Sequence, residues 1–228
     1  MNDKQLAARH AAAQVQDGML VGLGTGSTAN CFIEELARRR AEEGLQVTVA
    51  SSSTVSAIKA RALGLPLVAL EHLDRLDLYV DGADEVAPDL TLLKGRGFDL
   101  VREKLLARAA DAFLVLVDNS KLVGRIGERY PIPVEVMPFA WRLVLRRLEA
   151  VGGRGGLRPN AAGDGLAVTS HGSLVLDMAF GPEWDAQALD GALDATPGVV
   201  EHGIFRGLAS AVIIGAEGRV EERRAGAA

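Results

Sequence analysis

Short apolar segments alternate with helical patterns through the first half of the chain, and this alternation limits the fold more than any other feature. Four segments have the spacing of helices, at Lys4–Val15, Ala29–Arg40, Ser56–Leu63 and Leu100–Ala110. Five short apolar runs predict strands, at Met19–Gly24, Val47–Ala50, Leu67–Leu70, Leu78–Val80 and Phe113–Val117. Strands that alternate with helices usually form a parallel sheet. The sequence therefore predicts an α/β fold with an open parallel sheet and helices on both faces.

The second half of the chain has a different order of elements. A strand at Ile132–Met137 and a helix at Phe139–Val151 precede an expected hairpin of Leu166–Thr169 and Ser173–Met178 around His171–Gly172. A helix at Asp185–Ala195 and a strand at Val199–Phe205 follow. This β-α-β-β-α-β order is typical of a small ferredoxin-like unit. Ala211–Gly215 is predicted to return to the main sheet, and Glu221–Ala228 to form a frayed polar tail.

Composition excludes several classes of function. The 228 residues suit one large domain or two small ones. A net charge of −5 argues against binding along a nucleic-acid backbone, and 4% aromatic residues provide no platform for stacking bases. The single cysteine, Cys31, excludes an internal disulfide and a cysteine-cluster metal site. A polar N-terminus and the lack of a long apolar run predict a cytoplasmic protein without a membrane segment.

A glycine-rich turn between a predicted strand and a predicted helix is the first candidate site. The segment Gly22–Thr28 reads Gly-Leu-Gly-Thr-Gly-Ser-Thr, and it lacks the lysine of a P-loop. A dinucleotide site would need an acidic residue at the end of the next strand, where Ser51–Ser53 stands instead. A monophosphate cradle fits better, with hydroxyl donors from Thr25, Ser27 and Thr28 at a helix N-terminus. A tight turn that only caps the helix remains the alternative.

An acidic turn and a lysine-bearing loop follow later in the chain. Asp81–Glu85 comes after a predicted strand, where ligands bind in open α/β sheets, although Asp-Gly turns are also common without a ligand. Lys94–Gly97 leads into the helix that carries Glu103 on a stripe with apolar neighbours. Partial desolvation there would make Glu103 a useful general base, while favourable interaction with the helix dipole is the alternative explanation.

The four histidines have no metal-ligand spacing. His10, His72, His171 and His202 are scattered, so each is expected to be a surface or turn residue. No cage of histidines and carboxylates can be assembled from the sequence, and we therefore predict a site without a metal.

Taken together, these motifs resemble type A ribose-5-phosphate isomerases. The motifs that occur in the family's order are Gly22–Thr28, Ser51–Ser53, Asp81–Glu85, Lys94–Gly97, Arg102–Lys104 and Ser120–Lys121. Pro133–Val136, Gly152–Arg154 and Pro197–Val200 extend the resemblance over nearly the whole chain. Each motif alone is unspecific, but the ordered set is highly specific.

The resemblance implies a Rossmann-like catalytic domain at residues 1–127 and 206–228, with a ferredoxin-like lid at residues 128–205. It implies interconversion of D-ribose 5-phosphate and D-ribulose 5-phosphate by a homodimeric enzyme without metal or organic cofactor. By resemblance, Glu103 moves the proton, and Asp81, Asp84 and Lys94 line the reacting end of the sugar. The implied substrate-binding residues are Thr25, Gly26, Ser27, Thr28, Gly82, Ala83, Gly95, Arg96, Gly97, Lys121 and Lys4.

The chain departs from the family pattern at three positions. Arg96 stands where the family usually has glycine, Ser173 follows Gly172 where Gly-Asn is usual, and Ala57 replaces a common hydroxyl residue. A cation turned inward at position 96 would weaken a nearby carboxylate as a base, so we expect Arg96 to point outward. Two alternatives are a sugar-phosphate-sensing regulatory domain and a related amino-sugar phosphate isomerase.

Overall fold

The computed structural model describes residues 2–226 and divides by compactness into two units. The first unit contains the residues up to Ala83, Arg102–Leu122, and the residues from Leu208 on. The second contains Asp84–Val101 and Val123–Gly207. The domain boundaries expected from the sequence stay a prediction, and this division differs from them in grouping residues 84–101, 123–127 and 206–207 with the second unit.

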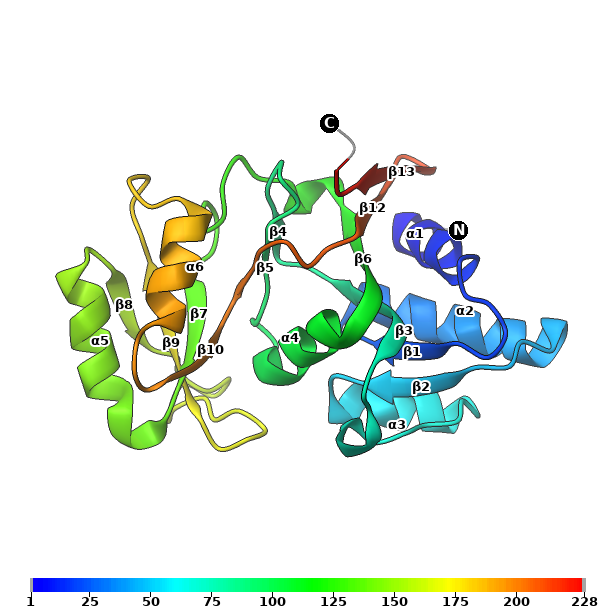
Figure 1. The fold of residues 1–228 in the computed structure, drawn as a ribbon, viewed down its shortest axis with the longest axis horizontal. Helices are drawn as coiled ribbons and strands as arrows, with labels where there is room; N and C mark the ends of the chain where they lie inside the picture. Colours follow the sequence, from blue (N-terminus) through cyan, green and yellow to red (C-terminus); the bar gives the residue numbers. More distant parts are fainter. Residues whose placement is uncertain (1, 227–228) are drawn as a thin grey trace. The chain divides into compact units, whose positions relative to one another are not determined.

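The first unit is built on a six-stranded sheet in the order β13-β12-β6-β3-β1-β2 (Figure 1). All of its neighbouring strands are parallel except β12 and β13. Its strands are β1 (Leu20–Leu23), β2 (Thr48–Ser51), β3 (Leu76–Gly82), β6 (Ala110–Asp118), β12 (Ala211–Ala216) and β13 (Arg219–Arg224). Its helices are α1 (Asp3–Ala12), α2 (Ser27–Glu43), α3 (Thr54–Ala62), η1 (Leu70–His72), η2 (Asn119–Lys121) and most of α4 (Leu100–Ala109). The predicted parallel α/β sheet is confirmed.

Alternation along β3 separates the two faces of this sheet. Leu78 and Val80 pack into one core with Ala11 of α1 and Phe32 of α2. Successive side chains of a strand point to opposite faces, so Tyr79 and Asp81 belong to the other face. Tyr79 stacks there on Phe113 of β6, with ring centroids 4.8 Å apart. The face with Leu78 and Val80 is therefore apolar and packs against helices, whereas the face with Tyr79 and Asp81 carries polar groups.

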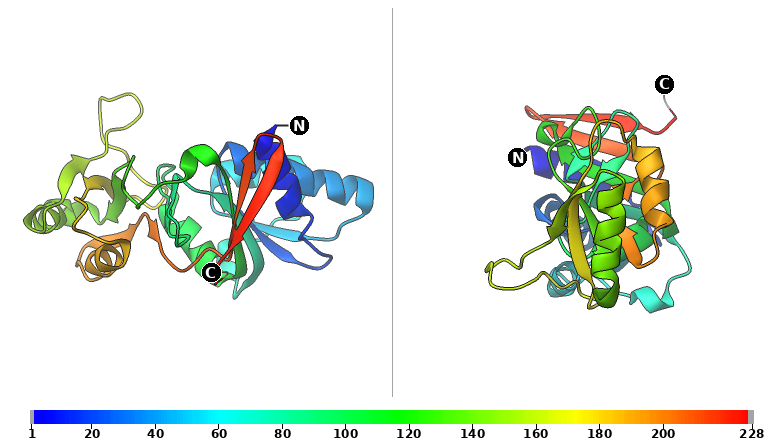
Figure 2. Two further views of the ribbon diagram at one scale, coloured as in Figure 1. Left: turned by 90° about the horizontal axis from the view of Figure 1, so that it is seen from above. Right: turned by 90° about the vertical axis from the view of Figure 1, so that its left-hand side faces the viewer.

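Glu221–Arg224 belongs to a strand, so the frayed tail predicted for Glu221–Ala228 is wrong over these residues. Residues 227–228 of that prediction lie outside the described part of the chain. Residues from Ala211 to Arg224 make an antiparallel hairpin of β12 and β13. Figure 2 shows this hairpin in red beside α1 in blue. The Asp3 carboxylate accepts hydrogen bonds from the backbone amides of Glu217 and Gly218, at 3.2 and 2.9 Å. Pairing with β12 and this tie to α1 order a segment whose charged sequence carries no strand pattern.

The second unit has the ferredoxin-like order that the sequence predicts. Its main sheet runs β10-β7-β9-β8, all antiparallel, and a small sheet runs β11-β5-β4. Val134, Val144 and Leu189 are among the residues that form its core, joining the main sheet to α5 and α6. The elements are β4 (Glu85–Val86), β5 (Leu92–Leu93), β7 (Ile132–Val136), η3 (Pro138–Ala140), α5 (Trp141–Ala150), β8 (Arg154–Leu157), β9 (Leu174–Ala179), α6 (Ala186–Asp194), β10 (Val199–His202) and β11 (Ile204–Phe205).

Two predicted strands are wrong in detail. Leu67–Leu70 makes only an isolated bridge from Leu67 to Val49, followed by η1. β9 pairs with β8 and β7, whereas Leu166–Thr169, its predicted hairpin partner, forms isolated bridges only. Gly155 allows the close approach in β8, since a Cβ there would lie 1.9 Å from the carbonyl oxygen of Asp177. Paired glycines concealed this strand from the sequence pattern.

Among the described residues, none of the helices has the length and apolar character needed to cross a membrane.

Candidate active site

The carboxyl ends of four parallel strands lie at one edge of the six-stranded sheet. Leu23 at the end of β1 is opposite Ser51 of β2 and Val80 of β3, and Gly82 of β3 is opposite Leu116 of β6. The chain leaves β1 toward β2 on one side, while β3 lies on the other side. Ligands of open α/β sheets bind at such a switch point. The loops after β1 and β3, which carry the predicted residues, flank it.

The loop after β1 presents the amino end of α2. Gly26 precedes α2 with a φ of 101°, a left-handed conformation that glycine adopts without strain. Lys4 Nζ donates a 2.9 Å hydrogen bond to Oγ of Ser27, the first residue of α2. No acidic residue occupies the first turn of this helix. The amides of a first turn and a nearby ammonium group both favour an anion, so this geometry suits the predicted phosphate cradle.

Thr25 turns its hydroxyl toward the serine-rich segment after β2. Thr25 Oγ1 donates to Ser53 Oγ at 2.7 Å and lies 3.2 Å from Ser52 Oγ. Ser56 Oγ donates to the carbonyl oxygen of Gly24 at 2.7 Å. These serines are buried, so their hydroxyls satisfy one another inside the fold. The Thr25 hydroxyl therefore orders the loop in this structure, whereas Ser27 is exposed and Thr28 half-buried.

Asp81 is held at the end of β3 by three hydrogen bonds and is 1% exposed. Its Oδ1 accepts from the backbone amides of Thr25 at 3.0 Å and Gly82 at 2.7 Å. Its Oδ2 accepts from the Tyr79 hydroxyl at 2.6 Å. Gly24 leaves the room for this arrangement, because a Cβ at that position would lie 2.0 Å from Asp81 Oδ1. The loop after β1 and the Asp81 carboxylate of β3 therefore hold each other in place.

Glu103 lies in the first turn of α4 and is 5% exposed. Burial, followed by the charges of Asp81 and Glu103, raises the pKa of the Tyr79 phenol well above its ordinary value. Both carboxylates therefore act on the same buried hydroxyl, which places Glu103 on the face of the sheet that carries Asp81. The sequence expected a partly desolvated Glu103, and the structure buries it.

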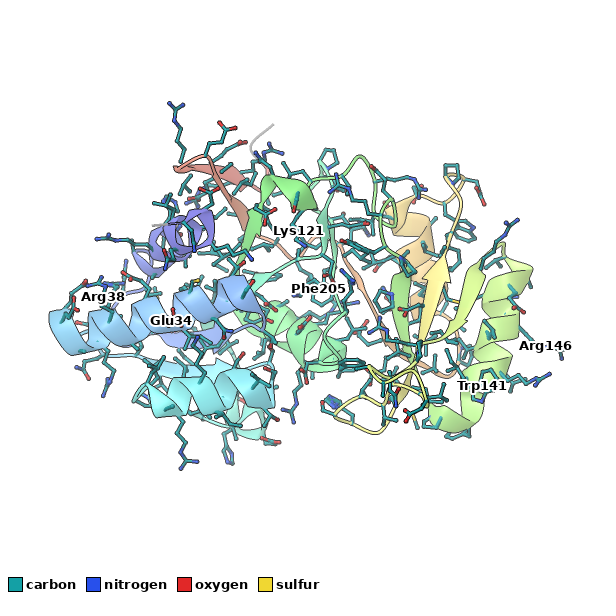
Figure 3. All side chains as sticks on the ribbon, turned by 180° about the vertical axis from the view of Figure 1, so that it is seen from behind. Glu34, Arg38, Lys121, Trp141, Arg146 and Phe205 are labelled. Atoms are coloured by element: carbon teal, nitrogen blue, oxygen red, sulfur yellow. The ribbon has the colours of Figure 1, made fainter. Side chains whose placement is uncertain are left out.

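Lys121 lies on η2, directly after β6, and is labelled in Figure 3. The Ser120 hydroxyl and amide bond to Asp118, and the Ser120 hydroxyl is the first cause that lowers the pKa of the Asp118 carboxyl. The charges of Lys121 and Lys4 lower it further. Two of the predicted substrate-binding cations thus act on one carboxylate at the end of β6.

The acidic turn continues into the second unit. The amide of Asp84 donates to the carbonyl oxygen of Leu93 at 2.8 Å. Glu85 is fully buried, and its carboxylate accepts from the backbone amides of Gly127, Arg129 and Tyr130 at 2.7 to 2.8 Å. Asp84 is half-buried beside this anchored glutamate, as is Ala83 at the end of the first unit. Glu85 therefore fixes the backbone on which Asp84 is carried.

Hydrogen bonds within the second unit anchor the first two residues of the Lys94 loop, Lys94 and Gly95. The Lys94 amide donates to the carbonyl oxygen of Gly203 at 2.9 Å, and the buried Lys94 Nζ lies 5.7 Å from the centre of the Phe205 ring. Gly95 has a φ of 97°, and its carbonyl oxygen accepts from Arg158 Nη1 at 3.1 Å. Gly97 is exposed. The lysine side chain is therefore fixed in a low-dielectric environment.

Arg96 points away from the buried part of this loop. It is exposed, and its guanidinium carbon lies 4.0 Å from the centre of the Tyr130 ring. A guanidinium over an aromatic face is attracted by the charge distribution of the ring. The Arg96 side chain therefore points outward, as expected, and its guanidinium contacts the ring of Tyr130.

His202 differs from the expectation of a surface or turn residue. It is fully buried, and its Nε2 lies 3.0 Å from Asp194 and 3.6 Å from Asp190. Among the described residues, these three make the one group whose ligand atoms lie close enough to hold a metal ion. The Ile204 amide approaches His202 Nδ1 at 3.3 Å, which fits an imidazole with its proton on Nε2. That nitrogen donates to the carboxylates, so the cluster fits hydrogen bonding better than metal binding.

A family model described as ribose 5-phosphate isomerase A (phosphoriboisomerase A) matches residues 47–219. This chain belongs to the ribose 5-phosphate isomerase A family. It is 49% identical over 220 residues to ribose-5-phosphate isomerase A of Roseiflexus sp. (strain RS-1), covering 96% of this chain and 94% of that protein. It is 47% identical to the enzyme of Methanothermobacter thermautotrophicus, covering 94% of each chain.

Solved structures of ribose 5-phosphate isomerase A share the whole fold. The enzyme from Methanocaldococcus jannaschii has a TM-score of 0.91 and 40% identity, covering 97% of this chain and 98% of its own. A D-ribose-5-phosphate isomerase solved with phospho-erythronic acid has a TM-score of 0.93 and 35% identity, covering 98% of this chain and 100% of its own. The protein is therefore an isomerase, and the alternatives of a regulatory domain or an amino-sugar enzyme are not favoured.

Sequence reasoning missed three residues that hold the candidate groups. Tyr79 donates to Asp81, Glu85 anchors the backbone beside Asp84, and Arg158 donates to the Lys94 loop. Tyr79 stands two positions before Asp81 in a strand, so alternation alone places both on one face. Arg158 is distant in sequence and carries no such signal.

Proposed function

We propose that this ribose 5-phosphate isomerase A family member interconverts D-ribose 5-phosphate and D-ribulose 5-phosphate by proton transfer through an enediol. An aldose–ketose exchange can proceed by proton transfer or by a metal-assisted hydride shift. Proton transfer needs one positioned carboxylate base and a cation near the developing oxyanion, and it needs no resident metal or organic cofactor.

The observation that carries this proposal is the hydrogen bond from the Thr25 amide to Asp81 Oδ1 at 3.0 Å. Thr25 belongs to the loop whose geometry suits a phosphate, and Asp81 is a buried carboxylate. A substrate with a phosphate at one end and a reacting carbonyl at the other matches this pairing. Binding energy from the phosphate then orients the reacting end.

Glu103 is the proposed base. Its carboxylate accepts the proton from C2 of the open-chain aldose, and that electron pair forms the C1–C2 double bond of the enediol. The carbonyl oxygen O1 gains the negative charge and then a proton. When the O2 hydroxyl loses its proton and C2=O2 forms, Glu103 returns a proton to C1. The burial of Glu103 supports this role because an apolar environment favours proton acceptance by a carboxylate.

The remaining residues receive roles by resemblance to the family. Lys94 stabilises the negative charge on oxygen in the enediolate, and Asp84 lines the reacting end. Asp81 assists opening of the sugar ring. The proposed substrate-binding residues are Thr25, Gly26, Ser27, Thr28, Gly82, Ala83, Gly95, Arg96, Gly97, Lys121 and Lys4.

The wider setting is proposed on the same basis. The family resemblance supports a homodimer that acts in the cytoplasm, in the non-oxidative branch of the pentose phosphate pathway. The partner is a small sugar phosphate, and neither nucleic acid nor a membrane is part of the proposal.

An assay of the purified chain with ribose 5-phosphate tests the proposed function. We expect ribulose 5-phosphate to appear at the same rate before and after exhaustive treatment with EDTA. The control adds Mg²⁺ or Mn²⁺ to the treated enzyme, which should leave the rate unchanged. Loss of activity with EDTA and its return with a divalent ion would refute the proton-transfer mechanism.

A further inference from the structure

Tyr79 is a buried tyrosine whose ring is fixed on more than one side. It is 0% exposed and stacks on Phe113 with an interplanar angle of 24°. On β1, a Cβ at Gly22 would lie 2.7 Å from Tyr79 Cδ2, so the glycine backbone packs directly against the ring. A side chain held this closely presents its hydroxyl at a defined place.

The hydroxyl of Tyr79 completes the anchoring of Asp81. The amides of Thr25 and Gly82 hold Oδ1, and the phenol holds Oδ2 at 2.6 Å. A carboxylate anchored at one oxygen can still rotate about its Cβ–Cγ bond, but one anchored at both oxygens is fixed. The phenol therefore sets the rotation of the Asp81 carboxylate.

Tyr79, Asp81, Thr25 and Ser52 form one polar cluster. The Tyr79 phenol donates to Asp81 at 2.6 Å, the Thr25 amide donates to the same carboxylate, and Ser52 Oγ lies 3.2 Å from Thr25 Oγ1. The Ser52 hydroxyl also acts on the phenol, because it lowers the pKa of Tyr79. Burial and the nearby carboxylates raise the pKa of Tyr79, so the phenol keeps its proton and remains a donor. The loop that suits a phosphate and the carboxylate of Asp81 are thereby joined through a tyrosine.

We propose that Tyr79 is a positioning residue that orients Asp81 for opening the furanose ring of the substrate. This inference rests on the proposed isomerase function. In the ring-opening step, Asp81 takes the proton of the anomeric hydroxyl O1 while C1=O1 forms. The C1–O4 bond breaks, its electron pair goes to O4, and Asp81 delivers the proton to O4. One proton moves from O1 to O4, and nothing is oxidised or reduced.

Ring opening and proton transfer at carbon can be measured separately, because only one of the two sugars forms a ring. Ribose 5-phosphate closes a five-membered ring between C1 and O4, so it must be opened before it reacts. Ribulose 5-phosphate cannot close the equivalent ring, because its O5 carries the phosphate. Exchange of the C1 hydrogen of the ketose with solvent therefore needs Glu103 but no ring opening. A group that acts on the ring affects the first process only.

The experiment compares Tyr79→Phe with the wild-type enzyme in two assays. The first is turnover of ribose 5-phosphate, and the second is initial deuterium incorporation at C1 of ribulose 5-phosphate in D2O. We expect kcat for ribose 5-phosphate to fall about tenfold or more, the effect of one lost hydrogen bond to a charged group. We expect deuterium incorporation to stay within about twofold of wild type, since the proton transfer step is intact.

Tyr130→Phe is the matched control, because it removes the hydroxyl of the other tyrosine and keeps its ring beside Arg96. It should leave both assays unchanged. Where Tyr79→Phe fails to fold, judged by thermal unfolding, Ser52→Ala removes the hydroxyl that acts on the phenol and contacts Thr25 Oγ1, and it should slow turnover of ribose 5-phosphate more than exchange.

Each result decides between the two proposals. Unchanged turnover in Tyr79→Phe, or an equal loss in both assays, would overturn the positioning role. If only Ser52→Ala folds, the positioning role is overturned when turnover of ribose 5-phosphate and deuterium incorporation into ribulose 5-phosphate fall equally, or when both stay at the wild-type rate. A wild-type enzyme that neither converts ribose 5-phosphate nor exchanges the C1 hydrogen would instead refute the proposed function itself.

Discussion

Lys4 Nζ and Ser27 Oγ lie 2.9 Å apart, which brings the cation of α1 to the first residue of α2. The dipole of α2 and the charge of Lys4 act in the same direction at this point, because both favour an anion. Neither residue is near the other in sequence, so the cradle depends on the packing of the two helices. Their contact is part of the core that includes Ala8 and Ile33.

Lys4→Met is expected to weaken binding of ribose 5-phosphate. The change removes one charged donor near the proposed phosphate position, so kcat/KM should fall about tenfold, mainly through KM. Lys59→Met is the matched control, since Lys59 pairs with Glu34 at 2.6 Å on the surface of the same unit. Steady-state kinetics of both variants provide the measurement. A kcat/KM for Lys4→Met equal to that of Lys59→Met would contradict the phosphate role.

Gly24→Ala is expected to displace Asp81. A Cβ at position 24 would lie 2.0 Å from Asp81 Oδ1, so the carboxylate or the loop must move. Misplacement of a reacting group by such an amount should reduce kcat by about a hundredfold. Gly191→Ala, in α6, is the control, because its Cβ meets no atom within 4 Å. Wild-type kcat in Gly24→Ala would show that the exact place of Asp81 does not matter.

Arg96→Gly is expected to leave the chemistry unchanged. The guanidinium is exposed over Tyr130, so its removal should change kcat less than about threefold and should lower stability by about 0.5–1 kcal/mol. The pH–rate profile of kcat/KM is the decisive measurement. If the acidic limb moves up by about one unit or more, the Arg96 charge acts on a catalytic carboxylate and the outward placement is wrong.

The sequence predicted the elements with clear periodicity and missed those that depend on partners. The strand that leads to Asp81 and the helix that carries Glu103 are confirmed as β3 and α4, because their apolar and helical patterns identify them locally. Arg154–Leu157 contains two glycines and was missed, since its strand exists only by pairing with β9. β13 (Arg219–Arg224) was missed for the same reason, because five of its six residues are charged, and its second part was included in the tail expected to fray from Glu221.

The candidate site was predictable as a set of residue types, but its geometry was not. The positions of Gly24 and Asp81 follow from motifs, whereas their contact depends on the register of β1 against β3. The outward orientation of Arg96 followed from electrostatics, but its contact with Tyr130 required the path of a later loop. Tyr79 was overlooked because a tyrosine in a strand is usually a packing residue.

The kinetics of Glu103→Gln test the central claim most directly. Glutamine keeps the size of the side chain and removes the base, so kcat should fall at least about a hundredfold while substrate binding stays largely intact. Glu149→Gln, on the exposed face of α5, is the matched control and should behave as wild type. Wild-type enzyme should incorporate solvent deuterium at C2 of ribose 5-phosphate, and Glu103→Gln should not. A variant with near wild-type kcat and normal deuterium incorporation would show that Glu103 is not the base.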